Sequence, residues 1–460
     1  MITMNDKKVL KDSLVVGFAM FAVFFGAGNL VFPPQIGLVS GAKVIPAAIG
    51  LALSGILFPM LAVAAVGNTG TKIQDITSHV HAKLHILCMV VGVMAVTFGT
   101  IPRCGGVAYE IGLMGILPEL PPISKWIFLL IFFGIAFLIA SSKSSVMDNI
   151  GKFITPALLI CLLIIVVLTI INPLGRPSGG VTDSPFTNAF LTAINTGDVG
   201  TGIVCAGIFI TTLNAKGYKP GREQKKILFR VIAVAFVLLF VIYAGLCYLG
   251  ATGTKYFAPD TENTVLLVGL VRRLAGYGGI VVLSLAIIFA CFTTAAGMIA
   301  TAADWINMLS KDKIPYRIAA LALSIAIMLV ASTGVSFIIR LSGPLFNFLF
   351  PMYMTLTVLG VCKKLIPNDG VWKGSILMAL VFGLYRAYSV AVTNGLISLR
   401  ISAIDNLVAA IPLAESGFPW LVPAIVGGIA GGILWKALGK ESIVDEMDRM
   451  LAEDEQNAAV

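Results

Sequence analysis

The sequence predicts an all-α integral membrane protein with twelve transmembrane helices. Of its 460 residues, 58% are hydrophobic and only 12% are charged, and the mean hydropathy is +0.96. A soluble domain carries about twice that fraction of charged residues, so these charges are too few to cover a water-facing surface. The charges also gather in short clusters between uncharged runs, which are long enough for the ~20 helical residues that cross a ~30 Å hydrocarbon core.

Twelve apolar segments follow one another along the chain. We expect transmembrane helices at residues 13–38, 44–67, 85–112, 126–142, 153–171, 186–213, 231–252, 279–303, 318–337, 341–362, 374–393 and 417–436. With the N-terminus inside the cell, most of the 32 lysines and arginines fall in connections on the cytoplasmic side. Because positive residues mark cytoplasmic loops, this distribution predicts that both termini are cytoplasmic. The net charge of +9 therefore reflects the positive residues of the cytoplasmic loops and does not indicate a nucleic-acid partner.

Glycines interrupt the first and the sixth of these segments. The first contains Gly26-Ala27-Gly28-Asn29 followed by Pro33-Pro34, and the sixth contains Thr196-Gly197-Asp198-Val199-Gly200. Glycine weakens a helix, and a carboxylate at membrane depth costs ~2.5–3.5 kcal/mol unless it is paired. Both stretches are therefore expected to be unwound, and close helix packing is the alternative explanation for their glycines.

Interrupted helices in corresponding positions of two halves indicate an inverted-repeat transporter with its binding site near the bilayer midplane. The expected fold is a five-plus-five inverted repeat with broken helices 1 and 6 and two extra C-terminal helices. Unwinding offers amides to an anion and carbonyls to a cation, which suits a zwitterionic amino acid. The expected organisation is a cytoplasmic N-terminal tail at 1–12, a first five-helix repeat at 13–171, a second, inverted repeat at 186–362, two additional helices at 374–436 and an acidic cytoplasmic tail at 437–460.

The first segment, from Gly17-Phe18 to Phe32-Pro33-Pro34-Gln35-Ile36-Gly37, resembles the first helix of the branched-chain amino acid:cation symporters, the bacterial branched-chain amino-acid carriers. The resemblance continues through Ile101-Pro102-Arg103 and Glu110 in the third segment and Asp198 in the sixth. It implies uptake of leucine, isoleucine and valine, driven by Na⁺ or H⁺, by a multi-pass protein of the bacterial inner membrane. It also implies a fold similar to that of the leucine transporter.

The resemblance further implies roles for individual residues, beginning with the amides of Ala27 and Gly28, which would receive the substrate carboxylate. The substrate-binding residues expected are Gly26, Ala27, Gly28, Asn29, Tyr109, Thr196, Gly197, Asp198 and Gly200. The sodium ligands expected are the carbonyls of Ala22, Phe25 and Ala290 and the hydroxyls of Thr293 and Thr294. The alternative for the two threonines is a hydrogen bond back to their own helix, which is common in membranes.

The charged residues inside the segments are candidates for function. Asp198 is expected to pair with the substrate ammonium, the coupling cation or Arg103, and a structural ion pair with Arg103 is the alternative. Arg103 and Glu110 lie seven residues apart, which places them on one helix face as candidate gate residues. Tyr109 carries a hydroxyl toward the site or simply packs its ring. The threonine oxygens favour Na⁺ as the coupling ion, whereas Asp198 keeps H⁺ open.

Other function classes find little support in the sequence. Neither Gly151-Lys152 nor Gly439-Lys440 continues into the Ser or Thr of a Walker A motif, so an ATP-driven pump is not expected. No hydrolase signature is present, and we expect no enzyme activity and no cofactor. Apart from the substrate and the lipid bilayer, no obligate partner is indicated. A carrier for another small neutral solute and, less favoured, an ion channel are the alternatives. The glycines at 427, 428, 431 and 432 predict close helix packing or a dimer contact.

Overall fold

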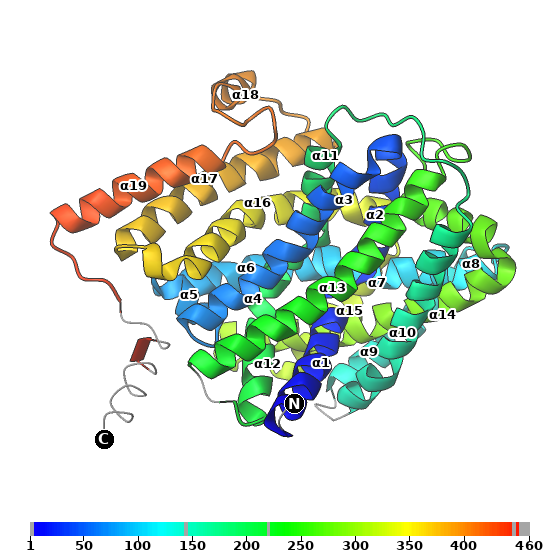
Figure 1. The fold of residues 1–460 in the computed structure, drawn as a ribbon, viewed down its shortest axis with the longest axis horizontal. Helices are drawn as coiled ribbons and strands as arrows, with labels where there is room; N and C mark the ends of the chain where they lie inside the picture. Colours follow the sequence, from blue (N-terminus) through cyan, green and yellow to red (C-terminus); the bar gives the residue numbers. More distant parts are fainter. Residues whose placement is uncertain (1–3, 142–145, 219–220, 444–447, 450–460) are drawn as a thin grey trace.

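The computed structural model describes residues 4–141, 146–218, 221–443 and 448–449, and this part of the chain contains helices and loops without a strand. The helices form one bundle in which most long helices run in similar or opposite directions (Figure 1). The predicted all-α fold class is therefore confirmed.

The helices follow the expected order along the chain. The first half contains α1 (Met4–Phe24), α2 (Ala27–Ser40), η1 (Gly41–Lys43), α3 (Val44–Ala52), η2 (Leu53–Leu57), α4 (Phe58–Thr69), α5 (Ile73–Ser78), α6 (Leu84–Ala95), η3 (Val96–Thr100), α7 (Ile101–Val107), η4 (Ala108–Leu113), α8 (Met114–Ile116), α9 (Ile123–Ser141) and α10 (Val146–Ile171). The remainder contains α11 (Pro185–Ala193), η5 (Ile194–Thr196), α12 (Asp198–Ala215), α13 (Arg222–Thr252), α14 (Asn263–Leu309), α15 (Tyr316–Ala331), α16 (Val335–Val361), η6 (Lys363–Leu365), α17 (Asp369–Thr393), α18 (Ser402–Ala409) and α19 (Leu421–Ala437).

Within the described residues, eight helices are long and apolar enough to cross a bilayer. Three shorter apolar helices, Pro156–Ile171, Tyr316–Ala331 and Leu421–Ala437, lie at the fifth, ninth and twelfth expected segments. Every one of the expected segments thus contains helix. That all twelve segments cross the membrane completely stays a prediction. Large aliphatic side chains on the outside of the bundle, such as Leu138 and Ile433, are more than half exposed and suit contact with lipid.

Two boundaries differ from those expected. α14 begins at Asn263, before the expected residue 279, and Gly276 kinks it with φ 61° and ψ −159°. The charged pair Arg272 and Arg273 precedes this kink, which is why hydropathy predicted only the second part of the helix. The ninth and tenth segments separate at 332–334, ahead of the expected residues, because Gly334 has a positive φ of 98°.

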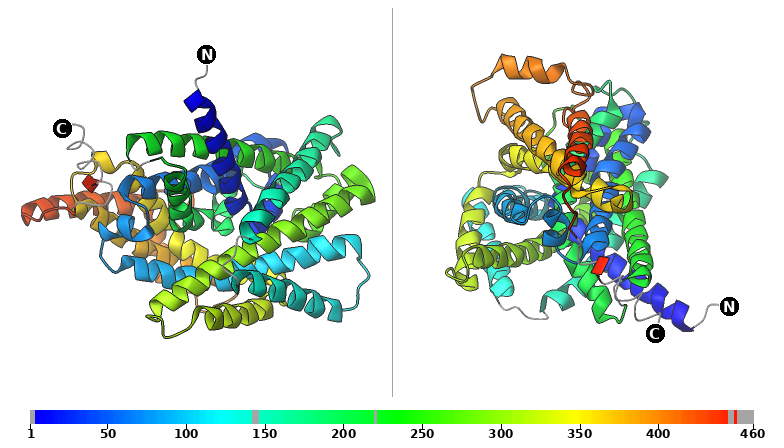
Figure 2. Two further views of the ribbon diagram at one scale, coloured as in Figure 1. Left: turned by 90° about the horizontal axis from the view of Figure 1, so that it is seen from below. Right: turned by 90° about the vertical axis from the view of Figure 1, so that its left-hand side faces the viewer.

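Glycines bring the backbones of neighbouring helices into contact, and Gly37 and Gly374 are two examples. A Cβ atom built on Gly37 of α2 would lie 1.8 Å from the carbonyl oxygen of Cys247 in α13. Likewise, a Cβ on Gly374 of α17 would lie 1.9 Å from the carbonyl oxygen of Gly427 in α19, and these two helices run side by side at one edge of the bundle (Figures 1 and 2). The glycine stripe of the last segment therefore packs within the chain, as the close-packing prediction has it.

The start of α1 is fastened to the connection between α12 and α13. Lys216 Nζ and Tyr218 Oη donate hydrogen bonds of 2.8 and 2.7 Å to the two carboxylate oxygens of Asp12. Burial opposes ionisation of Asp12, but these hydrogen bonds outweigh it, so the pKa of the carboxyl lies below its usual value. The contact places the beginning of the first segment and the end of the sixth at the same end of the bundle.

The approach of α2 to α13 predicts a large difference between two glycine substitutions. Gly37→Ala places a methyl group against backbone that cannot move aside, and we expect it to cost about 1–3 kcal/mol of stability or more. Gly134→Ala in α9 meets no atom within 4 Å and is expected to be neutral or slightly stabilising. The thermal unfolding midpoint of each variant in detergent measures the difference, and equal midpoints would contradict the close approach.

Candidate functional site

The first interruption lies between α1 and α2. α1 ends at Phe24, and Gly26 has an extended backbone with φ −113° and ψ −174° before α2 begins at Ala27. The carbonyl of Phe24 accepts a hydrogen bond of 2.6 Å from the side chain of Asn29 instead of continuing the helix. The predicted unwinding at Gly26 is therefore confirmed.

The second interruption lies between η5 and α12. Gly197 adopts a left-handed backbone with φ 80° and ψ 6°, and a Cβ on it would lie 2.7 Å from Cε1 of Phe346. Both the dihedral angle and the space require glycine here. Thr196 closes the turn, because its hydroxyl donates to the carbonyl of Ala193 and accepts from the amide of Asp198. The predicted break of the sixth segment is confirmed as well.

A buried polar cluster joins the two interruptions. Asn29 Nδ2 donates a hydrogen bond of 2.8 Å to Asp198 Oδ2 and also bonds to the hydroxyl of Tyr243 in α13. Asn29 and Asp198 are 2% and 6% exposed, so the carboxylate lies away from bulk water. A buried carboxylate is costly unless hydrogen bonds satisfy it, so this link holds α2 and α12 in register.

Arg103 of α7 lies between the same two interruptions. Its Nη1 donates to the carbonyl of Asn195 (2.8 Å) and its Nη2 to that of Thr196 (3.3 Å), which are the last carbonyls before the second break. The guanidinium also lies 5.4 Å from the ring centre of Phe32, and a Cβ on Gly28 would lie 2.8 Å from Nη2. Arg103 thus caps the negative end of the helix before the second break and lies against the first break.

Arg103 and Glu110 make separate contacts in this arrangement, and their role as gate residues stays a prediction. Arg103 pairs with neither Glu110 nor Asp198 in the part of the chain that the structure describes. Glu110 instead accepts hydrogen bonds of 3.1 Å from Thr264 Oγ1 and from the amide of Val335, where α16 begins. The seven-residue spacing assumed regular α-helix, whereas the π-helical segment η4 contains Glu110 and changes the face it occupies.

Tyr109 also points away from the interruptions. Its hydroxyl lies 2.9 Å from Ser124 Oγ in α9, and its ring packs 5.7 Å from that of Phe128. Both contacts are with the helix that follows in the chain, which agrees with the alternative of aromatic packing, and a contact of Tyr109 with substrate stays a prediction. The π-helical register of η4 turns this side chain toward α9.

The expected cation ligands lie at the junction of α1, α2 and α14. A Cβ on Gly26 would lie 3.9 Å from Cγ2 of Thr294, so α14 passes directly beside the first break. Thr293 Oγ1 donates a hydrogen bond of 3.0 Å to the carbonyl of Ala290, which is the alternative considered for it. These groups, with the carbonyls of Ala22 and Phe25, are all hard oxygen donors, which an alkali cation requires.

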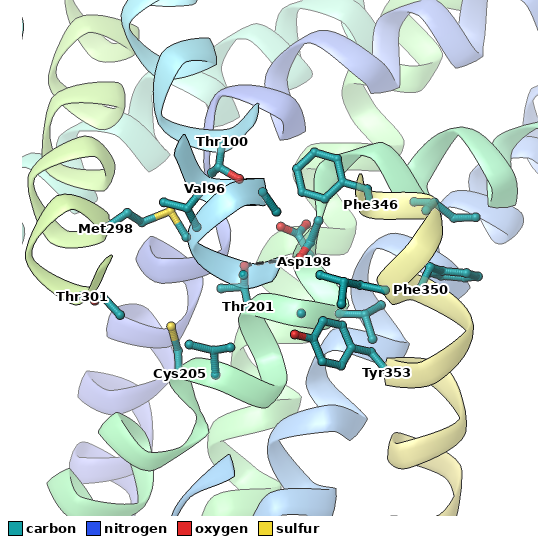
Figure 3. Close-up of a pocket in the computed structure, with 18 of the residues that line it drawn as sticks. Val96, Thr100, Asp198, Thr201, Cys205, Met298, Thr301, Phe346, Phe350 and Tyr353 are labelled. Atoms are coloured by element: carbon teal, nitrogen blue, oxygen red, sulfur yellow. Dashed lines mark hydrogen bonds between the residues drawn. The ribbon is translucent and has the colours of Figure 1, made fainter. Parts of the chain in front are cut away.

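A cavity of about 90 Å³ lies on the other side of Asp198. This volume is several times the ~10–15 Å³ that one water molecule needs, so the cavity admits a small organic group. Figure 3 shows Asp198 at the wall, with Val96 and Thr100 on one side and Phe346, Phe350 and Tyr353 on another. The lining residues come from α6, η3, α11, η5, α12, α14 and α16, and Gly197, Asp198 and Gly200 are the predicted ones among them. The predicted residues Gly26, Ala27, Gly28 and Asn29 do not line it, and Ala27, Gly28 and Asn29 are buried.

Most of the cavity wall was not predicted from the sequence. The lining residues missed include Val96, Thr100, Thr201, Cys205, Met298, Thr301, Phe346, Phe350 and Tyr353. The aliphatic and aromatic members have no sequence signal, because they resemble the packing residues of any membrane helix. The threonines offered the only hint, since each places a hydroxyl in an apolar segment.

Two interrupted helices, joined at a buried polar cluster beside an apolar cavity, give this multi-pass membrane protein a leucine-transporter-like fold. The nucleobase-cation-symport-1 family transporter Mhp1, in a closed conformation with bromovinylhydantoin bound, superposes with a TM-score of 0.57 at 13% identity over 95% of both chains. MhsT in complex with L-phenylalanine superposes with a TM-score of 0.55 at 15% identity, over 82% of this chain and 98% of MhsT. At these identities the likeness shows the fold.

The chain belongs to the branched-chain amino acid transport protein family, whose model matches residues 9–438. It is 31% identical to the branched-chain amino acid permease BrnQ of Bacillus subtilis over 439 residues, which cover 94% of this chain and 98% of the permease. It is 28% identical to the branched-chain amino acid transport system 2 carrier protein of Pseudomonas aeruginosa, over 93% of this chain and 97% of the carrier.

The cluster at the two interruptions predicts strong coupling between Asn29 and Asp198. Asn29→Ala and Asp198→Ala each remove the same buried hydrogen bond, so we expect each to lower transport at least about tenfold and the double variant to lower it no further. Uptake rates, corrected for the amount of protein in the membrane, give the coupling energy, expected at about 0.5–3 kcal/mol. Asn188→Ala, an exposed amide in α11, serves as the matched control, and additive losses would show that the two residues act separately.

Proposed function

We propose that this protein is a secondary active transporter that takes up leucine, isoleucine and valine by cation symport through alternating access. In this proposal it works in the bacterial inner membrane with both termini in the cytoplasm, and it performs no enzymatic step and carries no cofactor. The observation that carries the proposal is the Asn29–Asp198 hydrogen bond, which joins both interrupted helices at the wall of an apolar cavity. Its family membership supports the substrate class.

The cavity suits an amino acid with an aliphatic side chain. The carboxylate of Asp198 is the acidic group in its wall and attracts the substrate ammonium. The N-terminus of α12 presents its positive dipole end at Gly200, where a carboxylate is favoured. The aliphatic side chain then lies among Val204, Met298 and Phe346. One methylene changes binding in such a pocket by only ~1–3 kcal/mol, so leucine, isoleucine and valine are all expected to pass.

The position proposed here for the substrate carboxylate, at Gly200, differs from the position that the family resemblance implies. That resemblance places the substrate carboxylate at the amides of Ala27 and Gly28. The guanidinium of Arg103 already lies against Gly28, which favours the second interruption as the site in this conformation. The cavity extends from Asp198 along α12 to Cys205 and along α14 to Trp305. These residues lie toward the end of the bundle that carries Asp12 and Lys216, which we take as the direction of release.

The coupling cation enters this proposal as a second substrate beside Gly26 and Thr294. The first interruption leaves carbonyls without a helical partner, and binding a cation there orders the segment that carries Asn29. Because Asn29 bonds directly to Asp198, ordering of the first break stabilises the wall of the cavity. One cation moving inward gains ~2.3 kcal/mol per 100 mV of membrane potential. Na⁺ is favoured by the oxygen donors, and H⁺ carried by Asp198 is the alternative.

The threonine pair predicts a specific change in ion dependence. Thr293→Ala combined with Thr294→Ala removes two hydroxyls at the junction of α14 with the first break, and we expect the sodium concentration for half-maximal uptake to rise at least about tenfold. Thr169→Ala, which removes a buried hydroxyl bonded to its own helix in α10, is the control and should leave the sodium response unchanged. An unchanged response in the double variant would move the cation site elsewhere.

Uptake of labelled leucine into proteoliposomes tests the function itself. An inward Na⁺ gradient at constant pH is compared with a pH gradient without Na⁺, and unlabelled isoleucine and valine are added as competitors. Accumulation driven by Na⁺ with competition by both amino acids is the expected result. Accumulation driven by the pH gradient alone would assign the coupling to H⁺. No accumulation under either gradient would overturn the substrate and point to another small neutral solute.

A further inference from the structure

A second cavity, of about 380 Å³, lies at the end of the bundle where α16 ends and α17 begins. Three lysines line it, Lys225 from the first turn of α13 and Lys363 and Lys364 from η6. Asn68 at the end of α4 and Asn368 before α17 add amide groups. We call it the lysine cavity. Its residues come from five separate parts of the chain: the end of α4, the connection before α6, the start of α13, the region from α16 to α17, and the segment after α19.

The floor of the lysine cavity is a built structure. His79 Nδ1 and Asp369 Oδ1 lie 2.7 Å apart, and both residues are buried. The ring of Trp372 stacks on His79 at 4.7 Å, and Lys373 Nζ donates to the carbonyls of His79 and Val80. These contacts fix the connection before α6 to the first turn of α17. These contacts hold the floor of the cavity, and Ser442, Ile443 and Asp448 of the segment after α19 complete its wall.

The chain supplies an anion to this cavity itself. The carboxylate of Asp448 lies 2.8 Å from Lys363 Nζ. The segment after α19 is also anchored on Asp369, whose amide donates to Ser442 Oγ and whose carboxylate accepts from the amide of Ile443. The Asp448 side chain is 47% exposed. Such a pair is weak and screened by salt, so another anion can replace it.

An apolar surface continues from the rim of the cavity. Val361 lines the cavity and is 38% exposed, and Val358 and Leu365 beside it are 48% and 81% exposed. α16 is one of the helices long and apolar enough to cross the bilayer, so its end lies at the level of lipid headgroups. Lysines at this level attract phosphate groups of anionic lipids. We propose that the lysine cavity binds the phosphate of an anionic phospholipid, whose acyl chains follow Val358 and Leu365, and that Asp448 is the internal group it displaces.

The test uses the purified full-length protein in micelles that contain equal amounts of phosphatidylcholine and phosphatidylglycerol. Native mass spectrometry counts the lipids retained by the wild type and by the variant Lys363→Gln with Lys364→Gln. We expect the apparent affinity for phosphatidylglycerol to fall at least about tenfold in this variant and retention of phosphatidylcholine to stay the same. Lys83→Gln with Lys313→Gln changes the charge equally at two exposed lysines and should bind as the wild type does. Equal loss in both pairs, or no loss in either, overturns the proposal.

Two further variants separate binding from folding. Lys363→Arg with Lys364→Arg keeps the charge and is expected to retain phosphatidylglycerol, so loss in the glutamine variant cannot then be attributed to misfolding. Asp448→Asn removes the competing carboxylate and should tighten binding about two- to fivefold. Glycerol 3-phosphate is the arm that distinguishes the source of the phosphate. Glycerol 3-phosphate could bind the wild type, fail to bind the glutamine variant and prevent phosphatidylglycerol from binding. That result would show that the site takes a soluble phosphate ester, and it would overturn the lipid assignment.

Discussion

A hydrogen bond between Asn29 and Asp198 joins two helices that are each interrupted inside the membrane region, and the arrangement of the site depends on it. A carboxylate away from water must be satisfied by other groups, and here the amide of Asn29 supplies a donor. Tyr243 holds the same amide from α13. The cluster therefore fixes both interruptions relative to a continuous helix, and a change at one break is felt at the other.

The backbone at the two breaks is stabilised in different ways. At the second, Arg103 donates to the carbonyls of Asn195 and Thr196, which compensates the negative end of the preceding helix. At the first, Asn29 bonds the carbonyl of Phe24. Because Arg103 also lies against Gly28, one guanidinium contacts both interruptions. The third segment thus acts as a support for the breaks, and its π-helical segments η3 and η4 adjust the faces that do so.

The fold was predictable from the sequence to a large extent, because hydropathy and the glycine pattern reflect interactions with a uniform solvent. The expected segments contain helix, and both breaks fall where Gly26 and Gly197 predicted them. The site was predictable only in part. Asp198, Gly197 and Gly200 line the cavity, whereas Tyr109 and Glu110 face other helices. Their orientation depends on one extra residue in a helical turn, and no residue type in η4 signals it.

The sequence by itself determined that this chain is a membrane-embedded helical protein with two interrupted helices, because burial in lipid restricts composition and glycine restricts where a helix can unwind. Only the tertiary structure decided which residues meet. Asn29 and Asp198 are 169 positions apart, and the cavity wall combines four distant parts of the chain. The lysine cavity likewise joins His79 to Asp369 across 290 positions. Such contacts arise from the packing of whole helices, which local sequence patterns do not encode.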